Sequence, residues 1–283
     1  MAVNNSLTQN KPRIGLAAFL NAENVVCNID QALGKDNRQR FITGVISAVN
    51  TNSSLIECTN QSILSAALLG EALKLSPSPQ LGHYYMVPFN DRENGKVAQF
   101  QLGYKGYIQL ALRSGQYKKL NVLAIKEGEL VRFDPLNEEI EVNLIEDEEQ
   151  REAAPTMGYY AMFEYLNGFR KAIYWSKAKM ESHAIKYSKG YQAKKGYTFW
   201  EKDFDGMAYK TMLRQLISKW GIMSIDMQMA FESDMAVVRE DGTKEYVDAP
   251  DIIDAEATVV GNTEVVEVPA EPKTTAADAL FGK

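Results

Sequence analysis

The 283-residue chain has little cysteine and little histidine: two of each, Cys27 and Cys58, and His83 and His183. So few cysteines predict a protein without structural disulfides, and the two distant histidines lack companion ligands at the spacing of a zinc site. No run of about 18 apolar residues occurs, and the amino terminus lacks a signal-peptide stretch. The sequence therefore predicts a cytoplasmic protein that has no membrane segment, metal or other cofactor.

The sequence motifs of several enzyme classes are also missing. The Gly-Lys pairs at 34, 95 and 282 are not followed by Ser or Thr, so nucleotide hydrolysis by a P-loop has no support. Neither G-x-S-x-G nor H-E-x-x-H occurs. The acids between Glu146 and Glu152 could supply a two-metal nuclease, but adjacent acids in a polar loop are ordinarily solvated. We therefore predict that the protein is not an enzyme.

Charge is unevenly distributed along a chain whose net charge is −6. Residues 232–283 contain 13 acidic and 4 basic residues, a net charge of −9, so residues 1–231 carry +3. Within this body, residues 176–219 contain 10 Lys or Arg and 4 Asp or Glu. A basic stretch of this length is a candidate footprint for a polyanion.

Hydrophobic periodicity and turn signals predict an α+β fold. We expect a mostly antiparallel sheet with hairpins packed against helices, a helical N-terminal lobe and a disordered C-terminal tail. The expected helices cover residues 36–49, 60–73, 104–114, 176–187 and 204–220, and the expected strands cover 83–89, 96–103, 120–126, 129–133, 140–144, 157–166 and 169–175. Asn167-Gly168 is a strong hairpin signal, because both residues tolerate positive φ.

Composition divides the chain into three parts. Residues 1–35 are expected to be flexible or partly helical, residues 36–231 to form the α+β core, and residues 232–283 to form an acidic disordered tail. Within the core, the helices of 36–80 have wide apolar faces that either the protein's own sheet or a neighbouring subunit must cover. We therefore also consider 36–80 an oligomerisation lobe.

The run from Gln99 to Tyr117, QFQLGYKGYIQLALRSGQY, interleaves glutamine, tyrosine, lysine and arginine with small residues. Lysine and arginine can neutralise phosphates, glutamine can bond to phosphate, sugar or base, and tyrosine offers a face for an unstacked base. Lys105, Gln109 and Arg113 should form one polar stripe opposite Ile108, Ala111 and Leu112. The competing interpretation is a half-buried strand that runs into an ordinary amphipathic helix.

A second basic segment alternates lysines with aromatic residues between Lys186 and Lys202. Single-stranded nucleic acid needs both types, because its backbone must be neutralised and its exposed bases need stacking partners. Lys210 and Arg214 follow four residues apart on the last expected helix. For each aromatic residue taken singly, Trp200 included, core packing is the competing interpretation.

These segments resemble the RecT-type single-strand annealing proteins of phage recombination. The resemblance covers roughly residues 40–225, with a further short match at PDIIDAE from Pro250. It rests on QFQLGYKGYIQLALRSGQYKKLNV from Gln99, EYLNGFRKAIYWSK from Glu164 and WEKDFDGMAYKTMLRQLISKWG from Trp200. It implies an ATP-independent protein that binds single-stranded DNA, anneals complementary strands through a duplex intermediate, and assembles into rings or helical filaments. It also implies a partner 5′-to-3′ exonuclease.

The two segments and the family resemblance together predict a set of residues that contact DNA. The basic candidates neutralise phosphates, and the glutamines and aromatic residues contact sugar or base. The candidates are Gln99, Gln101, Tyr104, Lys105, Tyr107, Arg113, Lys118, Lys186, Lys189, Trp200, Lys202, Lys210 and Arg214. For Lys210→Ala we predict a log-affinity against log-salt slope reduced in magnitude by about 0.7.

Two other functions share these electrostatic features. One is a general single-stranded DNA or RNA binder that protects strands without annealing them. The other is an assembly protein whose basic strip contacts the acidic tails of neighbouring subunits. The acidic tail itself could dock a nuclease or a host single-strand-binding protein, or mimic DNA and restrain binding. In that last case truncation after Phe231 raises DNA affinity or leaves it unchanged.

Overall fold

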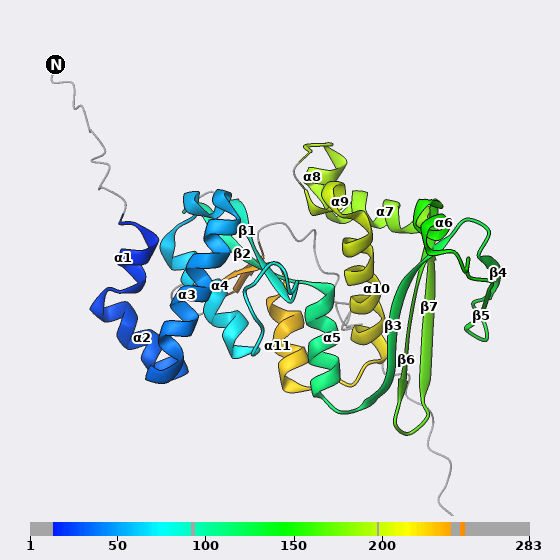
Figure 1. Cartoon of the computed structure of the whole chain (residues 1–283), viewed down its shortest axis with the longest axis horizontal. Coiled ribbons are helices and arrows are strands. Elements are labelled where there is room, and N and C mark those ends of the chain that lie inside the picture. Colours follow the sequence, from blue (N-terminus) through cyan, green and yellow to red (C-terminus); the bar gives the residue numbers. More distant parts are fainter. Residues whose placement is uncertain (1–13, 92–93, 197, 239–243, 247–283) are drawn as a thin grey trace, which may run out of the picture. The chain divides into compact units, whose positions relative to one another are not determined.

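The computed structural model describes residues 14–91, 94–196, 198–238 and 244–246, which all belong to one compact unit spanning residues 1–250 (Figure 1). Helices and antiparallel sheets alternate along it, so the predicted α+β class is confirmed. Within the described residues no helix is both long and apolar enough to cross a membrane.

The N-terminal part is helical. It contains α1 (Leu16–Leu20), α2 (Glu23–Leu33), α3 (Lys35–Thr51), the 3-10 helix η1 (Ser53–Glu57) and α4 (Asn60–Ala72). The helices predicted over 36–49 and 60–73 are therefore confirmed as α3 and α4. Gly34 joins α2 to α3 with φ of +77°, a conformation that favours glycine. The side chain of Thr59 caps α4 by accepting a hydrogen bond from the Ser62 N–H at 3.3 Å.

The apolar faces of α3 and α4 are covered by the chain itself. Phe41, Val45 and Val49 of α3 are at most 4% exposed, and so are Ile63 and the other core positions of α4. They pack in one cluster with residues of the first sheet. The apolar helix faces that suggested an oligomerisation lobe are therefore buried within a single copy of the chain.

The first sheet has the order β1-β2-β8-β9. Its strands are β1 (Tyr84–Asp91), β2 (Gly95–Leu102), β8 (Ala236–Val238) and β9 (Lys244–Tyr246). The predicted hairpin of β1 and β2 is confirmed, with Tyr84 opposite Leu102 and Asp91 opposite Gly95. Helix α5 (Tyr104–Arg113) follows β2 directly.

The second sheet has the order β3-β6-β7, with β3 (Tyr117–Lys126), β6 (Thr156–Tyr165) and β7 (Arg170–Ser176). Gly168 lies between β6 and β7 with φ of +86°, so the predicted hairpin turn is confirmed. Tyr159 and Phe163 face helices α7 (Lys177–Tyr187) and α10 (Phe204–Trp220). Tyr160 and Met162 face the separate ladder of β4 (Leu130–Asp134) and β5 (Glu139–Val142). Alternate side chains of β6 thus pack on opposite faces of the sheet, one set against α7 and α10 and the other against the β4-β5 ladder.

Four helices were not expected. They are α6 (Glu148–Ala153), α8 (Lys189–Gln192), α9 (Phe199–Lys202) and α11 (Ile225–Ser233). The prediction of a solvated loop over 146–152 is wrong in part, because the Asp147 side chain caps α6 by accepting from the Gln150 N–H at 2.8 Å.

The tail boundary at 232 also falls inside ordered structure. Helix α11 continues to Ser233, and strand β8 follows it. Ser233 and Asp234 are at most 2% exposed. The prediction of disorder for 239–243 and 247–283 lies outside the described residues.

Candidate nucleic-acid interface

The junction of β2 and α5 is built on close backbone contacts. The Gly103 N–H donates to the His83 carbonyl at 2.9 Å. A Cβ at Gly103 would lie 2.2 Å from the Gly82 carbonyl oxygen, so only glycine permits this approach. The QLGYKG segment therefore needs Gly103 for packing, whether or not the segment contacts DNA.

The predicted polar stripe of α5 exists, and its residues differ in their surroundings. Lys105, Gln109 and Arg113 are all exposed. The Arg113 guanidinium donates to the Leu73 carbonyl at 2.6 Å, which ties α5 to the end of α4. Leu112, expected on the apolar face, is 54% exposed. Lys105 is thus the predicted phosphate contact of this helix that best retains access to solvent.

The two glutamines of β2 share a face, as predicted, but that face is covered. Gln99 is 3% exposed and its side-chain amide donates to the Met235 carbonyl. The amide of Gln101 donates to the Gln99 side-chain oxygen at 2.9 Å. Gln99 was predicted to contact DNA from the surface, and this expected accessibility is wrong. Its amide instead joins the segment after α11 to β2.

Four further donors converge on Asp234, which is 2% exposed. Its Oδ1 accepts from the Leu102 N–H at 2.9 Å and from the Lys210 ammonium at 2.8 Å. Its Oδ2 accepts from the Tyr107 hydroxyl at 3.0 Å and from the Arg214 guanidinium at 2.9 Å. Arg214 also donates to the Tyr107 hydroxyl oxygen at 3.2 Å. This cluster, the Asp234 network, connects β2, α5, α10 and the end of α11.

Burial sets the electrostatics of the Asp234 network. Burial alone would raise the pKa of Asp234, but Lys210 and Arg214 outweigh it and hold that pKa below its usual value. Burial lowers the pKa of Lys210 despite the pairing with Asp234. Burial and then Asp234 raise the pKa of Tyr107. A carboxylate with four donors is satisfied internally, so the network is structural.

Tyr107, Lys210 and Arg214 were predicted to contact DNA, and the structure places all three in the Asp234 network. Tyr107 and Lys210 are buried and Arg214 is half-buried. The four-residue spacing of Lys210 and Arg214 does put them on one side of α10, but that side faces Asp234. The basis for the predicted change in salt slope of Lys210→Ala is therefore lost.

The segment from α7 to α9 is where exposed basic residues gather. Seven of its lysines are exposed and only two acidic residues, Glu181 and Glu201, lie among them. The lysines are Lys177, Lys179, Lys186, Lys189, Lys194, Lys195 and Lys202. Figure 1 shows α8 and α9 next to the N-terminal end of α10. Lys186, Lys189 and Lys202 thus keep the exposure that a phosphate contact requires.

Aromatic rings lie among these lysines. The Lys179 ammonium is 4.5 Å from the centroid of Trp175, and the Lys186 ammonium is 5.2 Å from that of Tyr187. Trp200, predicted to contact DNA, is 7% exposed and packs edge-on against Phe204 at 5.1 Å. Core packing, the competing interpretation, therefore describes Trp200.

Aromatic contacts connect β1 to α9 and α5 to α10. Tyr85 of β1 lies 5.6 Å from Phe199 of α9, and Tyr104 of α5 lies 5.6 Å from Tyr209 of α10, measured between ring centroids. All four rings are half-buried. Tyr85 and Tyr209 had no signal in the sequence, because each lies in an element whose neighbours are mostly core residues. We call these four rings with the exposed Lys105 and Lys202 the α5/α9 surface.

Lys118 is exposed, but its ammonium lies 2.5 Å from a Glu164 carboxylate oxygen. The side chain remains 55% exposed, so this pair is of the solvent-screened type. Lys118 thus keeps exposure to solvent while its ammonium pairs with Glu164, whose side chain is 16% exposed.

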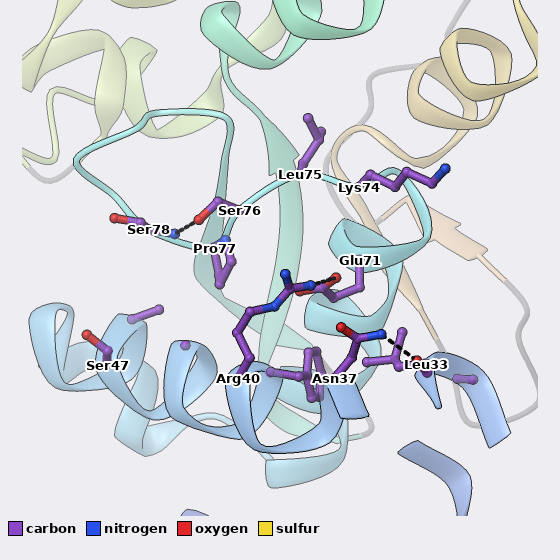
Figure 2. A pocket seen from close by; sticks show the side chains of 14 residues that line it. Leu33, Asn37, Arg40, Ser47, Glu71, Lys74, Leu75, Ser76, Pro77 and Ser78 are labelled. Atoms are coloured by element: carbon purple, nitrogen blue, oxygen red, sulfur yellow. Dashed lines mark hydrogen bonds and ion pairs between the residues drawn. The ribbon is translucent and has the colours of Figure 1, made fainter. Parts of the chain in front are cut away.

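A cavity of about 700 Å³ lies between α3 and the segment 74–78 (Figure 2). Arg40 and Glu71 face each other across its wall at 3.8 Å, and Asn37 donates to the Leu33 carbonyl. Arg40 and Glu71 therefore offset each other, and none of the described lining residues is a predicted DNA contact.

The sequence pattern of the RecT family matches residues 39–251, three quarters of the chain. The chain belongs to the RecT family. It is 40% identical over 274 residues to the uncharacterized protein YqaK of Bacillus subtilis strain 168, which covers 95% of this chain and 87% of that protein. It is 29% identical over 252 residues to protein RecT of Escherichia coli K12, which covers 87% of this chain and 88% of RecT.

This membership confirms the resemblance found in the sequence. It associates the chain with single-strand annealing in recombination and with oligomerisation. The matched region includes the β2 and α5 junction, the segment from α7 to α9 and the Asp234 network. It also extends past Ser233, in agreement with the ordered structure found there.

His183 gives α7 a pH-dependent stability. Its ring lies between Trp175 and Tyr187, at centroid distances of 5.5 and 4.4 Å. Burial and then Lys186 lower its pKa to about 4. As pH falls from about 6.5 to 4, the unfolded chain takes up this proton before the folded chain does, so stability is lost in that window.

We expect His183→Gln to flatten the loss of stability between pH 6.5 and 4. The measurement is the urea midpoint of wild type and variant at pH 7.5, 5.5 and 4.5. The carboxylates that titrate in the lower part of this window are the same in both chains, so their contribution to the change in stability cancels in the comparison. Parallel curves for the two chains would show that His183 titrates normally in the folded protein.

Proposed function

We propose that this RecT-family protein binds single-stranded DNA and anneals complementary strands without ATP hydrolysis, in phage-type homologous recombination. The observation that carries the proposal is the family match over residues 39–251. The exposed lysines from α7 to α9 support it, because they offer a polyanion a row of phosphate contacts beside half-buried aromatic rings.

The proposed mechanism uses charge and alignment. Exposed lysines such as Lys105 and Lys202 neutralise the phosphates of an extended strand, and half-buried rings of the α5/α9 surface contact its sugars or bases. The bases then stay available to a second strand, and base pairing itself drives annealing. No step of this mechanism needs a nucleophile, a metal or a nucleotide.

The test mixes two complementary fluorescent oligonucleotides with the protein, without ATP. Its controls are a protein-free reaction and a non-complementary pair. We expect pairing to be faster with protein. Binding without acceleration would favour a protein that only protects single strands, and an absence of binding at low salt would reject both functions.

We further propose that the protein acts in the bacterial cytoplasm as a ring or helical filament. Its substrate is then prepared by a partner exonuclease, and the acidic C-terminal segment is the proposed docking site for that partner or for a host single-strand-binding protein. Truncation after Phe231 is unsuitable as a test, because it removes Asp234 from the core. A chain that ends at Tyr246 keeps the Asp234 network and removes only the acidic segment that follows.

A further inference from the structure

One end of the β3-β6-β7 sheet exposes a group of large apolar side chains. Leu166 and Phe169 come from the turn between β6 and β7, and the others come from the end of α10, the start of α11 and the connection between them. The Ile222 N–H donates to the Tyr165 hydroxyl at 2.5 Å and thereby holds the two segments together. The exposed fractions are 68% for Leu166, 47% for Phe169, 38% for Trp220, 43% for Ile222, 41% for Met223 and 81% for Ile225. We call this group the hairpin end.

Basic side chains surround the hairpin end. The Lys171 ammonium lies 4.3 Å from the centroid of Trp220, and Arg170 and Lys219 beside it are exposed. The basic residues there are Lys118, Lys119, Arg170, Lys171 and Lys219, against Glu138, Glu164 and Asp226. A contiguous apolar patch with a charged rim is the composition of a protein interface.

The other end of the same sheet also exposes apolar side chains, and the charged residues around them are mostly acidic. Buried Glu129 organises it, because its carboxylate accepts from the Lys126 and Ile145 N–H groups and from Arg151 of α6. Leu130, Val131 and Leu144 flank these residues and are 36%, 53% and 50% exposed. We call this group, with α6, the helix end.

Acidic side chains surround the helix end. Glu127 and five acidic residues of the segment that contains α6 are exposed: Glu146, Asp147, Glu148, Glu149 and Glu152. Lys126 and the first lysines of α7, Lys177 and Lys179, offset part of this charge, and the acids remain in excess. The helix end is therefore the electrostatic complement of the hairpin end.

The two ends cannot meet within one chain. Strand β6 runs from Thr156 at the helix end to Tyr165 at the hairpin end, nine steps of about 3.3 Å, or roughly 30 Å. Figure 1 shows α6 and the turn between β6 and β7 at opposite ends of the sheet. Among the described residues, each of these two ends can therefore meet the other only on a second molecule.

We infer that the hairpin end of one copy docks on the helix end of a second copy. Each copy then uses two different surfaces, so the contact is head-to-tail and repeats into a ring or an open helical filament. The inference deepens the proposed function, on which it rests, by naming the surfaces of assembly. Part of its strength is electrostatic, so assembly should weaken as salt is raised.

The test uses two charge-reversed variants in sedimentation velocity at micromolar concentration, with and without a single-stranded oligonucleotide. Glu146→Lys with Glu152→Lys makes the helix end basic, and Arg170→Glu with Lys219→Glu makes the hairpin end acidic. We expect each variant alone to associate about tenfold or more weakly than wild type. An equimolar mixture should regain association, because each end then faces an oppositely charged partner.

Recovery on mixing separates an interface from a loss of folding, since two misfolded variants would not restore each other. The matched control, Glu23→Lys with Asp36→Lys, makes the same charge change at exposed residues of α2 and α3 and should leave the size distribution unchanged. Wild-type size in both variants, failure of the mixture to recover, or a wild-type chain that stays monomeric with and without DNA would each overturn the inference.

Annealing is measured on the same samples. A wild-type chain that anneals while both variants keep its size would reject the interface and leave the proposed function in place. A wild-type chain that assembles through these ends without annealing would reject the function and keep the interface.

Discussion

Asp234→Ala should lower the free energy of unfolding by roughly 3–5 kcal/mol, the usual cost of removing one partner from a buried ion pair. The substitution leaves the Lys210 ammonium, 8% exposed, and the Arg214 guanidinium without their carboxylate. It also removes an acceptor from the Tyr107 hydroxyl and from the Leu102 N–H. Urea denaturation at pH 7 measures the change.

The matched control is Glu149→Ala, which removes a carboxylate from an exposed position and should change stability by less than about 0.5 kcal/mol. Lys210→Ala should destabilise the fold as Asp234→Ala does, and should leave the salt dependence of DNA binding unchanged. If Lys210→Ala instead keeps full stability and reduces the salt slope, Lys210 is a phosphate contact after all and the network opens on binding.

Replacing Lys105, Lys186, Lys189 and Lys202 together by alanine should produce the largest loss of DNA affinity. All four side chains are exposed, so the substitutions remove positive charge from the surface. If each neutralises one phosphate, the log-affinity against log-salt slope falls in magnitude by about 2.8, and affinity at 0.15 M salt falls on the order of 100-fold. Fluorescence anisotropy with a labelled single strand over a salt series gives both quantities.

The control for this variant removes Lys35 and Lys74, two lysines of the N-terminal part. Lys35 is exposed at the start of α3, and Lys74 follows α4. We expect this pair to change the slope by much less than the four-lysine variant. An equal change in slope per lysine in the two variants would mean that DNA binding follows net charge rather than the surface formed by α5 and α7 to α9.

Local signals in the sequence were sufficient for α5 and α7 of this surface, whereas α8 and α9 were not expected. The strands β1 and β2, the helices α3, α4, α5, α7 and α10, and the turn at Gly168 follow from periodicity, capping and turn chemistry. These depend on neighbours within a few residues, so the chain alone shows them. The RecT family was also evident from the long motifs at Gln99, Glu164 and Trp200, and the family match confirms it.

The same local reasoning could not tell which polar residues face solvent. Lysine, arginine and tyrosine in a helix look alike from sequence, whether they reach water or a buried carboxylate. Asp234 lies 20 or more residues from Lys210 and Arg214, and more than 100 from Tyr107, in a segment whose composition is that of a tail. Burial of such a group is tolerable only when its partners arrive from elsewhere in the fold.

The sequence by itself thus determined the longer helices and the hairpins of the core, the family, and the existence of a basic, aromatic-rich region. Tertiary structure alone decided that Gln99, Tyr107, Lys210 and Arg214 take part in internal hydrogen bonds, while Lys105, Lys186, Lys189 and Lys202 remain exposed to solvent. The physical reason is that hydrophobic periodicity is a property of a segment. Pairing of a charge, by contrast, is a property of the space around it, which only the folded chain defines.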